Sequence, residues 1–168
     1  MTRRPITKRV AVVTAGALVA VGTFAAGVGV AGPEKQISKK PTKREIAAQF
    51  DGWNKALRTG DPETVADRYA KDAVLLPTVS NKVRSDHAGI VDYFEHFLLN
   101  KPVGKKIETH INILDNNSAL DTGVYEFTLT DPDTGAKRVV EARYTYEYEK
   151  RNGQWKIVNH HSSAMPEG

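Results

Sequence analysis

Apolar residues downstream of residue 41 follow a helical spacing first and an alternating spacing later. Residues 42–45, Thr-Lys-Arg-Glu, have the form of a capping box, and Gly60 is placed to end the helix that follows. One apolar stripe with gaps of three or four residues lies between these signals. Its members are Ile46, Phe50, Trp53 and Leu57. The pattern predicts a first helix with one buried face.

Two further helices are predicted before residue 103. Asp61-Pro62-Glu63 combines an N-cap, a proline at the first helical position and an acid in the first turn, and so predicts a short second helix. Its predicted buried side is Val65, Ala66, Tyr69 and Ala70. Residues 73–79 contain Pro77 and predict an edge or bent strand. Ser85 or Asp86 caps a third helix with the stripe Ile90, Tyr93, Phe94, Phe97 and Leu98.

The remaining residues alternate between apolar and polar, as strands do. We predict strands over residues 107–114, 120–130, 137–149 and 155–162. Turn-forming residues separate them, and Arg151-Asn152-Gly153 has the form of a hairpin turn. Helices followed by hairpin-linked strands predict an α+β domain, in which helices pack on one face of a curved antiparallel sheet.

The first 32 residues have the composition of an export segment. Residues 1–9 contain Arg3, Arg4, Lys8 and Arg9 without an acid, and residues 10–31 are apolar, Gly or Thr. We expect an export signal, which is either cleaved or kept as a membrane anchor. Export would follow either the general or the twin-arginine route. A lysine-rich tether over residues 33–41 then leads to the domain, which lies outside the cytoplasm.

Removing the export segment changes the charge of the chain. The full sequence has 24 Lys and Arg against 20 Asp and Glu, and four of the bases lie in residues 1–32. The remainder is therefore balanced, and the sequence predicts no nucleic-acid-binding face. The chain contains no cysteine, so neither a disulfide nor a lipoprotein anchor can form.

Several local segments resemble one known family. Residues 141–166, which include Trp155-Lys156-Ile157-Val158-Asn159-His160-His161, resemble the closing segment of the association domain of calcium/calmodulin-dependent kinase II. Residues 101–103, 110–113 and 59–61 support the same resemblance. It covers residues 42–166 and implies the cone-shaped fold of the nuclear-transport-factor-2-like (SnoaL-like) superfamily, with three helices on the concave face of the sheet. The sequence has no Gly-rich phosphate loop, no catalytic-loop motif and no calmodulin-binding basic helix, so we expect neither kinase activity nor calmodulin binding.

The resemblance implies a cavity between the sheet and the helices. In the kinase hub this cavity is lined with arginines and takes a small carboxylate. Arg143 stands at one of those positions, whereas Glu126 and Ser162 stand at two others. A hairpin around Asp133 puts Glu126 opposite residues 141–143, so we expect an Arg143–Glu126 ion pair. The pair either belongs to a polar pocket or only neutralises two buried charges.

His160 and His161 are adjacent strand residues and so point to opposite faces. They cannot easily bind the same ion. A zinc site would also need His110 or a carboxylate close by, and no ligand spacing supports one, so we predict no metal site. His160 is expected to face the cavity, with Trp53, Tyr69 and Tyr93 as core residues or cavity walls. The predicted pocket is Trp53, Tyr69, Tyr93, Glu126, Glu141, Arg143, His160 and Ser162.

An inward Arg143 would place the tyrosines beside it on the outer face. We therefore predict an interface formed by Tyr144, Tyr146, Tyr148 and His161. Members of the family dimerise through this sheet and the kinase hub forms larger rings. The expected partner is accordingly a second copy of the chain, in a homodimer or a higher even-numbered oligomer, and the expected ligand is a small polar molecule. Only residues 10–31, if uncleaved, would contact a membrane.

Two functional classes stay open. The first is a non-catalytic assembly or ligand-binding domain, and the second is a small cone-fold enzyme that transfers protons, like isomerases and cyclases of the superfamily. Candidate bases for an enzyme are Glu126, Glu141 and His160. Pairing with Arg143 would lower the pKa of Glu126 and suit it poorly to that task, which favours the binding domain. No nucleotide fingerprint or redox group is present, so we expect no cofactor, although some relatives are called oxidoreductases.

Overall fold

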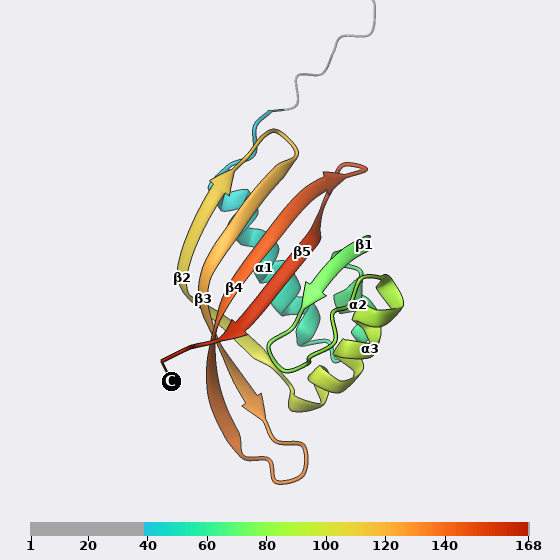
Figure 1. The fold of residues 1–168 in the computed structure, drawn as a ribbon, viewed down its shortest axis with the longest axis vertical. Helices are drawn as coiled ribbons and strands as arrows, with labels where there is room; N and C mark the ends of the chain where they lie inside the picture. Colours follow the sequence, from blue (N-terminus) through green and yellow to red (C-terminus); the bar gives the residue numbers. More distant parts are fainter. Residues whose placement is uncertain (1–38, 168) are drawn as a thin grey trace, which may run out of the picture. The chain divides into compact units, whose positions relative to one another are not determined.

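The computed structural model describes residues 39–167 (Figure 1). The predicted export signal over residues 1–32 and most of the tether over residues 33–41 lie outside this range. None of the helices within residues 39–167 is both long and apolar enough to cross a membrane.

The first helix forms as its end signals predict. Helix α1 (Lys43–Leu57) begins at a complete capping box: Glu45 N donates to Thr42 Oγ1 at 3.2 Å, and Thr42 N donates to the Glu45 carboxylate at 2.7 Å. Gly60, just beyond the helix, has a φ of +72°, which a residue without a Cβ adopts at little cost. The predicted stripe is buried, with Trp53 only 2% exposed.

The other helices are short and begin at aspartates. Asp61 caps α2 (Pro62–Ala66), and Asp86 caps α3 (His87–Phe97), whose end continues into the 3-10 turn η1 (Leu98–Asn100). Tyr69 and Ala70, which we assigned to the stripe of the second helix, belong instead to the first strand. Their burial is as expected, but the helix ends before them.

Five strands form one sheet in the order β1-β5-β4-β3-β2. Their bounds are β1 (Tyr69–Leu76), β2 (Val103–Ile113), β3 (Ser118–Thr130), β4 (Lys137–Arg151) and β5 (Gln154–Ala164). Strands β2 to β5 pair antiparallel, as the alternating pattern predicts. The edge strand β1 pairs parallel with β5, so the sheet is mixed, and β1 ends just before Pro77. Figure 1 shows α1 running along one face of the sheet.

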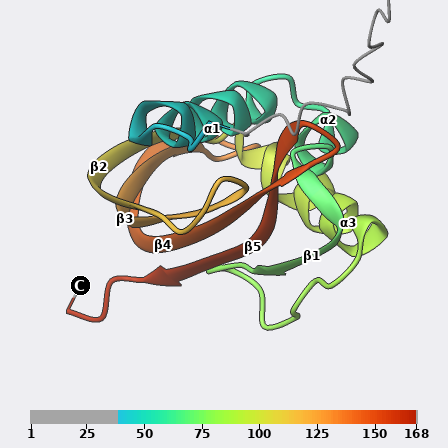
Figure 2. The ribbon, with the colours of Figure 1, turned by 90° about the horizontal axis from the view of Figure 1, so that it is seen from above.

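The sheet curves around the helices, which lie on its concave side (Figure 2). Three register shifts interrupt the pairing of its strands: β2 has one between Lys106 and Glu108, β5 has one where Val158 is the extra residue, and β1 has one between Tyr69 and Val74. Opposite the first shift, Gly123 lies so close to the Glu108 carbonyl that a Cβ there would come within 2.0 Å of the oxygen. Only glycine fits this position.

A side-chain clamp fixes α1 to strand β2. Asn54 is nearly buried; its Nδ2 donates to Gly104 O at 2.7 Å and its Oδ1 accepts from Gly104 N at 2.9 Å. The amide satisfies a backbone pair that would otherwise be buried without partners. The clamp holds Trp53, the next residue, against the inner face of the sheet.

Candidate functional site

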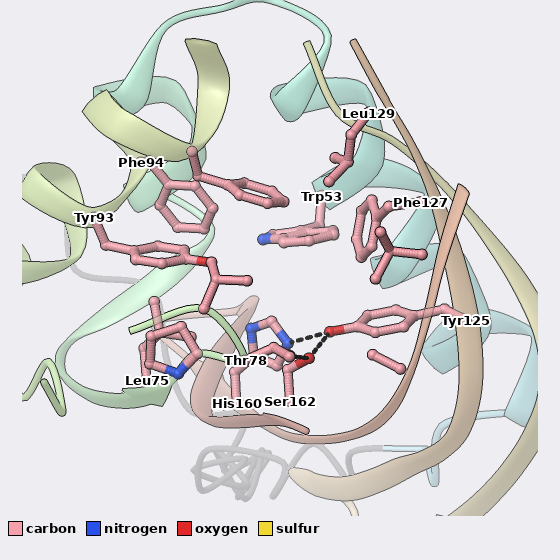
Figure 3. A pocket seen from close by; sticks show the side chains of 15 residues that line it. Trp53, Leu75, Thr78, Tyr93, Phe94, Tyr125, Phe127, Leu129, His160 and Ser162 are labelled. Atoms are coloured by element: carbon pink, nitrogen blue, oxygen red, sulfur yellow. Dashed lines mark hydrogen bonds between the residues drawn. The ribbon is translucent and has the colours of Figure 1, made fainter. Parts of the chain in front are cut away.

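A small cavity lies where α1 and α3 meet the inner face of the sheet (Figure 3). Its volume is about 50 Å³, well below the ~300–1,000 Å³ of cavities that hold drug-sized ligands. On the scale where one water needs roughly 10–15 Å³, it has room for a small molecule or a few waters. We call it the aromatic cavity; its lining is Trp53, Leu75, Pro77, Thr78, Val79, Tyr93, Phe94, Phe97, Tyr125, Phe127, Leu129, Val140, Ala142, His160 and Ser162.

Aromatic rings form much of the wall. The Trp53 indole meets Phe94 and Phe127 edge to face, with ring centroids 6.3 Å and 6.1 Å apart. The His160 imidazole lies edge to face with Trp53 at 5.6 Å and stacks on Tyr146 at 4.1 Å. Such contacts hold each ring in one orientation, so the wall is rigid and largely apolar.

The polar groups of the cavity gather at the sheet. Trp53 Nε1 donates to Tyr69 Oη at 3.0 Å, and Tyr69 Oη lies 2.9 Å from His160 Nδ1. On the other side of the imidazole, His160 Nε2 lies 3.4 Å from Tyr125 Oη. His160 is therefore held between two phenols.

The hydrogen bonds continue from Tyr125 to the cavity surface. Tyr125 Oη donates to Ser162 Oγ at 2.6 Å, and Ser162 Oγ in turn bonds the hydroxyl of Thr78, in the segment after β1. Figure 3 shows these bonds at the bottom of the cavity. We call Tyr69, His160, Tyr125, Ser162 and Thr78 the hydroxyl–imidazole chain.

Burial keeps His160 neutral. The side chain is 3% exposed, and desolvation, with a smaller contribution from the charge of His161, lowers its pKa from 6.5 to about 3. The charged form loses more by leaving water than the neutral form does. At neutral pH the imidazole is thus one donor and one acceptor in the chain.

Half of the predicted pocket is found at the aromatic cavity. Trp53, Tyr93, His160 and Ser162 line it. Tyr69 lies behind the wall and bonds two of the lining residues.

The other predicted pocket residues face away from the cavity. Arg143 and Glu141 are exposed on the outer face of β4, so their assignment to the pocket is wrong. Glu126 also lies on the outer face, where it pairs with Lys105 at 3.2 Å and not with Arg143. The register explains this, because Glu126 stands opposite Glu141 while Arg143 stands opposite Val124. Matching Arg143 to an arginine of the kinase hub cavity had therefore assigned the wrong face of β4 to the cavity.

The predicted interface is corrected for the same reason. Tyr144, Tyr146 and Tyr148 point inward and are at most 3% exposed. A row of three aromatic rings has far more apolar area to bury than the row of Arg143 and its neighbours, so the tyrosine row occupies the core. His160 faces the cavity and His161 the outer face, in agreement with the alternation.

A second polar group on the inner face was not predicted from the sequence. Lys106 forms an ion pair with Asp121, whose side chain is fully buried, and Tyr144 Oη donates to Asp121 Oδ1 at 3.0 Å. The Lys106 ammonium lies 4.9 Å from the centroid of the Phe50 ring. We call Lys106, Asp121 and Tyr144 the ion-pair cluster. Asp121 lies on the same face of β3 as Tyr125 and Phe127, because even spacing along a strand keeps residues on one face. This spacing could have predicted from the sequence that Asp121 points inward.

No metal-binding arrangement is found within residues 39–167: nowhere in this range do three or more His, Cys, Asp or Glu residues gather as ion ligands would.

The curved sheet with helices on its concave face and a cavity between them defines a class. It is the nuclear-transport-factor-2-like, or cystatin-like, cone fold. Within this class, residues 42–166 match the calcium/calmodulin dependent protein kinase II association domain, and the chain belongs to that family. None of the curated proteins matches the chain.

Solved structures support both levels of the assignment. A Xanthomonas campestris protein described as an association domain of this kind is 58% identical, with a TM-score of 0.75 over 76% of this chain and 91% of its own. A nuclear transport factor 2 superfamily protein from Salmonella enterica is 18% identical, with a TM-score of 0.62 over 72% and 89%. A Novosphingobium aromaticivorans protein described as a scytalone dehydratase is 15% identical, with a TM-score of 0.65 over 73% and 83%. The last two likenesses concern the fold alone.

Proposed function

We propose that the chain is a non-catalytic, self-associating domain that holds a small molecule in the aromatic cavity. The observation that carries this proposal is the cavity itself: aromatic side chains form much of its apolar wall, and a few polar groups face it. Ligand sites typically combine an apolar lining with a few placed polar groups.

The positions of the candidate bases support a binding role. Glu126 and Glu141 lie on the outer face of the sheet, away from the cavity. His160 is at the cavity, but its pKa of about 3 makes it a weak proton acceptor at neutral pH.

Acid–base catalysis is the second candidate. The observation that favours it is the continuous chain of phenol, imidazole and hydroxyl groups at the cavity, and a relative of the same fold is described as a dehydratase. Turnover of the molecule that copurifies with the domain would decide for this candidate.

Self-association is proposed from the family, whose domain is named for it. The outer face of β3, β4 and β5 is the surface we assign, with Val124 and His161 near its centre. Val124→Glu should give a folded monomer by light scattering, while Leu99→Glu on η1 should leave an even-numbered oligomer. An oligomer that persists in Val124→Glu contradicts this choice of surface.

The apolar residues 10–31 support an extracytoplasmic location. The test is fractionation of the producing cell. We expect the domain outside the cytoplasmic fraction, either shortened by cleavage or bound to the membrane; a full-length chain in the cytoplasm contradicts the proposal.

Native mass spectrometry tests the ligand directly. The gently purified natural protein should carry a small molecule, and Ala142→Leu should lose it because the added carbons enter the cavity from its wall. Arg143→Ala is the matched control, since the adjacent side chain is exposed on the opposite face. A ligand retained in Ala142→Leu, or found in neither protein, rules out this cavity as the site.

A further inference from the structure

The hydroxyl–imidazole chain has a fixed direction that starts at Trp53. The indole N–H can only donate, so Tyr69 Oη accepts from it at 3.0 Å. The Tyr69 proton then has His160 Nδ1 as its acceptor, at 2.9 Å. The reverse arrangement would leave the Tyr69 O–H buried without an acceptor, which costs free energy. Nδ1 is accordingly bare, and the neutral ring carries its proton on Nε2.

The far end of the chain has one proton more than it can use. Ser162 Oγ accepts the proton of Tyr125. Ser162 and Thr78 then share a single hydrogen bond but own two hydroxyl protons. One proton remains whichever residue donates, and both residues line the aromatic cavity. The cavity therefore offers a free O–H donor at its polar end.

Tyr93 supplies a second donor from the opposite wall. Its hydroxyl projects from α3 into the cavity in Figure 3, and it has no hydrogen-bond partner within residues 39–167. Burial raises the pKa of Tyr93 well above its ordinary value of 10, so the phenol keeps its proton. Two hydroxyl groups from different elements thus face the same cavity.

No ionic side chain balances these donors. The lining contains no Asp, Glu, Lys or Arg, and its one histidine is neutral. A charged ligand would lose its hydration without gaining an opposite charge, which is unfavourable in an apolar cavity. A neutral acceptor oxygen loses little and gains the free donors.

We propose that the aromatic cavity selects a small neutral molecule with a hydrogen-bond-accepting oxygen, such as a ketone or aldehyde, over a carboxylate or an ammonium of the same size. This inference rests on the proposed function, that the cavity binds a small molecule, and adds the chemical class. It narrows the small polar molecule expected from the sequence to a neutral one, and it differs from the small carboxylate that the kinase hub takes.

Three four-carbon probes of different charge test the selection on the full-length protein: 2-butanone, butyrate and butylamine at pH 7. Titrations followed by amide chemical-shift changes of the lining residues should give 2-butanone at least about tenfold tighter binding than either ion, the worth of one good hydrogen bond. The carbonyl ¹³C resonance of labelled 2-butanone should also move downfield on binding, as it does when the oxygen accepts hydrogen bonds.

Variants assign the donors. Tyr93→Phe should reduce the downfield shift and weaken 2-butanone by up to about tenfold, with the remaining shift due to the spare proton of the Ser162–Thr78 pair, while Tyr148→Phe should change neither. Tyr148 is the control because its buried hydroxyl also has no partner within the described residues, but it does not line the cavity. An unchanged shift in Tyr93→Phe would overturn the inference.

The remaining outcomes separate the inference from the proposed function. Equal or tighter binding of butyrate or butylamine would overturn the selection and leave a ligand-binding cavity. Failure of all three probes, together with no copurifying molecule, would overturn both. Imidazole ¹⁵N shifts provide a ligand-free check: Nδ1 of His160 should resonate as a bare nitrogen from pH 8 to pH 5, and a protonated Nδ1 would reverse the chain and contradict the inference.

Discussion

Two polar groups lie on the inner face of the same sheet, and they are satisfied in opposite ways. In the ion-pair cluster both oxygens of the Asp121 carboxylate have partners: Lys106 on Oδ2 and Tyr144 on Oδ1. The rings of Phe50 and Tyr144 face the Lys106 ammonium at 4.9 Å and 5.6 Å. Neither charged residue lines the aromatic cavity.

The hydroxyl–imidazole chain is neutral throughout and ends at an open space. Its last members, Ser162 and Thr78, line the aromatic cavity and keep a spare proton. The difference follows from the cost of desolvation. A buried charge must be fully paired, whereas a hydroxyl that has no protein partner costs less and can bond a ligand or water. The charged group is therefore closed by its own partners, whereas the neutral group keeps a donor that a ligand can use under the function we propose.

Removing the acid of the ion-pair cluster should have the largest effect. Asp121→Ala leaves the Lys106 ammonium, whose side chain is only 16% exposed, without its partner, and we expect the free energy of unfolding to fall by about 3 kcal/mol. Urea denaturation measures this. Glu126→Ala is the control, because its pair with the exposed Lys105 lies on the outer face and should cost less than about 1 kcal/mol. Similar losses in the two variants would mean that Lys106 reaches solvent.

Acid should lower the stability of the fold through protonation of His160 in the hydroxyl–imidazole chain. Its pKa of about 3 in the folded protein lies below the 6.5 of the unfolded chain. The unfolded state then binds the extra proton between these values, so the free energy of unfolding decreases as pH falls from 6.5 toward 3. Its slope should be up to about 1.4 kcal/mol per pH unit steeper in the natural protein than in His160→Gln.

The exposed neighbour provides the control for this titration. His161→Gln should leave the slope unchanged, since His161 lies on the outer face. Identical slopes for the natural protein and His160→Gln would show that the imidazole takes up its proton as readily in the folded protein as in the unfolded chain. The hydroxyl–imidazole chain would then carry a charge in acid, and it would no longer differ from the ion-pair cluster in containing no charged group.

Local signals in the sequence predict much of the fold. The capping box at Thr42, the stripe through Trp53 and the Asn152-Gly153 turn depend on neighbours in the chain, and each is found as predicted. The parallel pairing of β1 with β5 depends on residues far apart in the sequence. Tyr69 and Ala70 fit a helical stripe as well as a strand, so the start of β1 could not be chosen from spacing alone.

The faces of the strands were harder to predict than the strands. Alternation along β4 separates Arg143 from Tyr144 but does not say which one points inward. Ile107 and Val158 are extra residues at register shifts, and each reverses the alternation of faces along its strand. Lys106 therefore points to the inner face, and Ile157 rather than Val158 is buried in the core. The apolar area of the tyrosine row is the physical reason that decides the face, and it outweighs a match at one arginine.

The smallest effect should come from opening the neutral chain near the cavity. Ser162→Ala removes the acceptor of the Tyr125 proton and the partner of Thr78, but water can enter the cavity and replace the lost oxygen. We expect a loss of about 1 kcal/mol in urea denaturation, well below that of Asp121→Ala. Ser163→Ala, on the adjacent residue that faces outward, should cost less than about 0.5 kcal/mol. A loss as large as that of the ion-pair variant would mean that the hydroxyl–imidazole chain is closed to water, and its spare proton would then be structural rather than offered to a ligand.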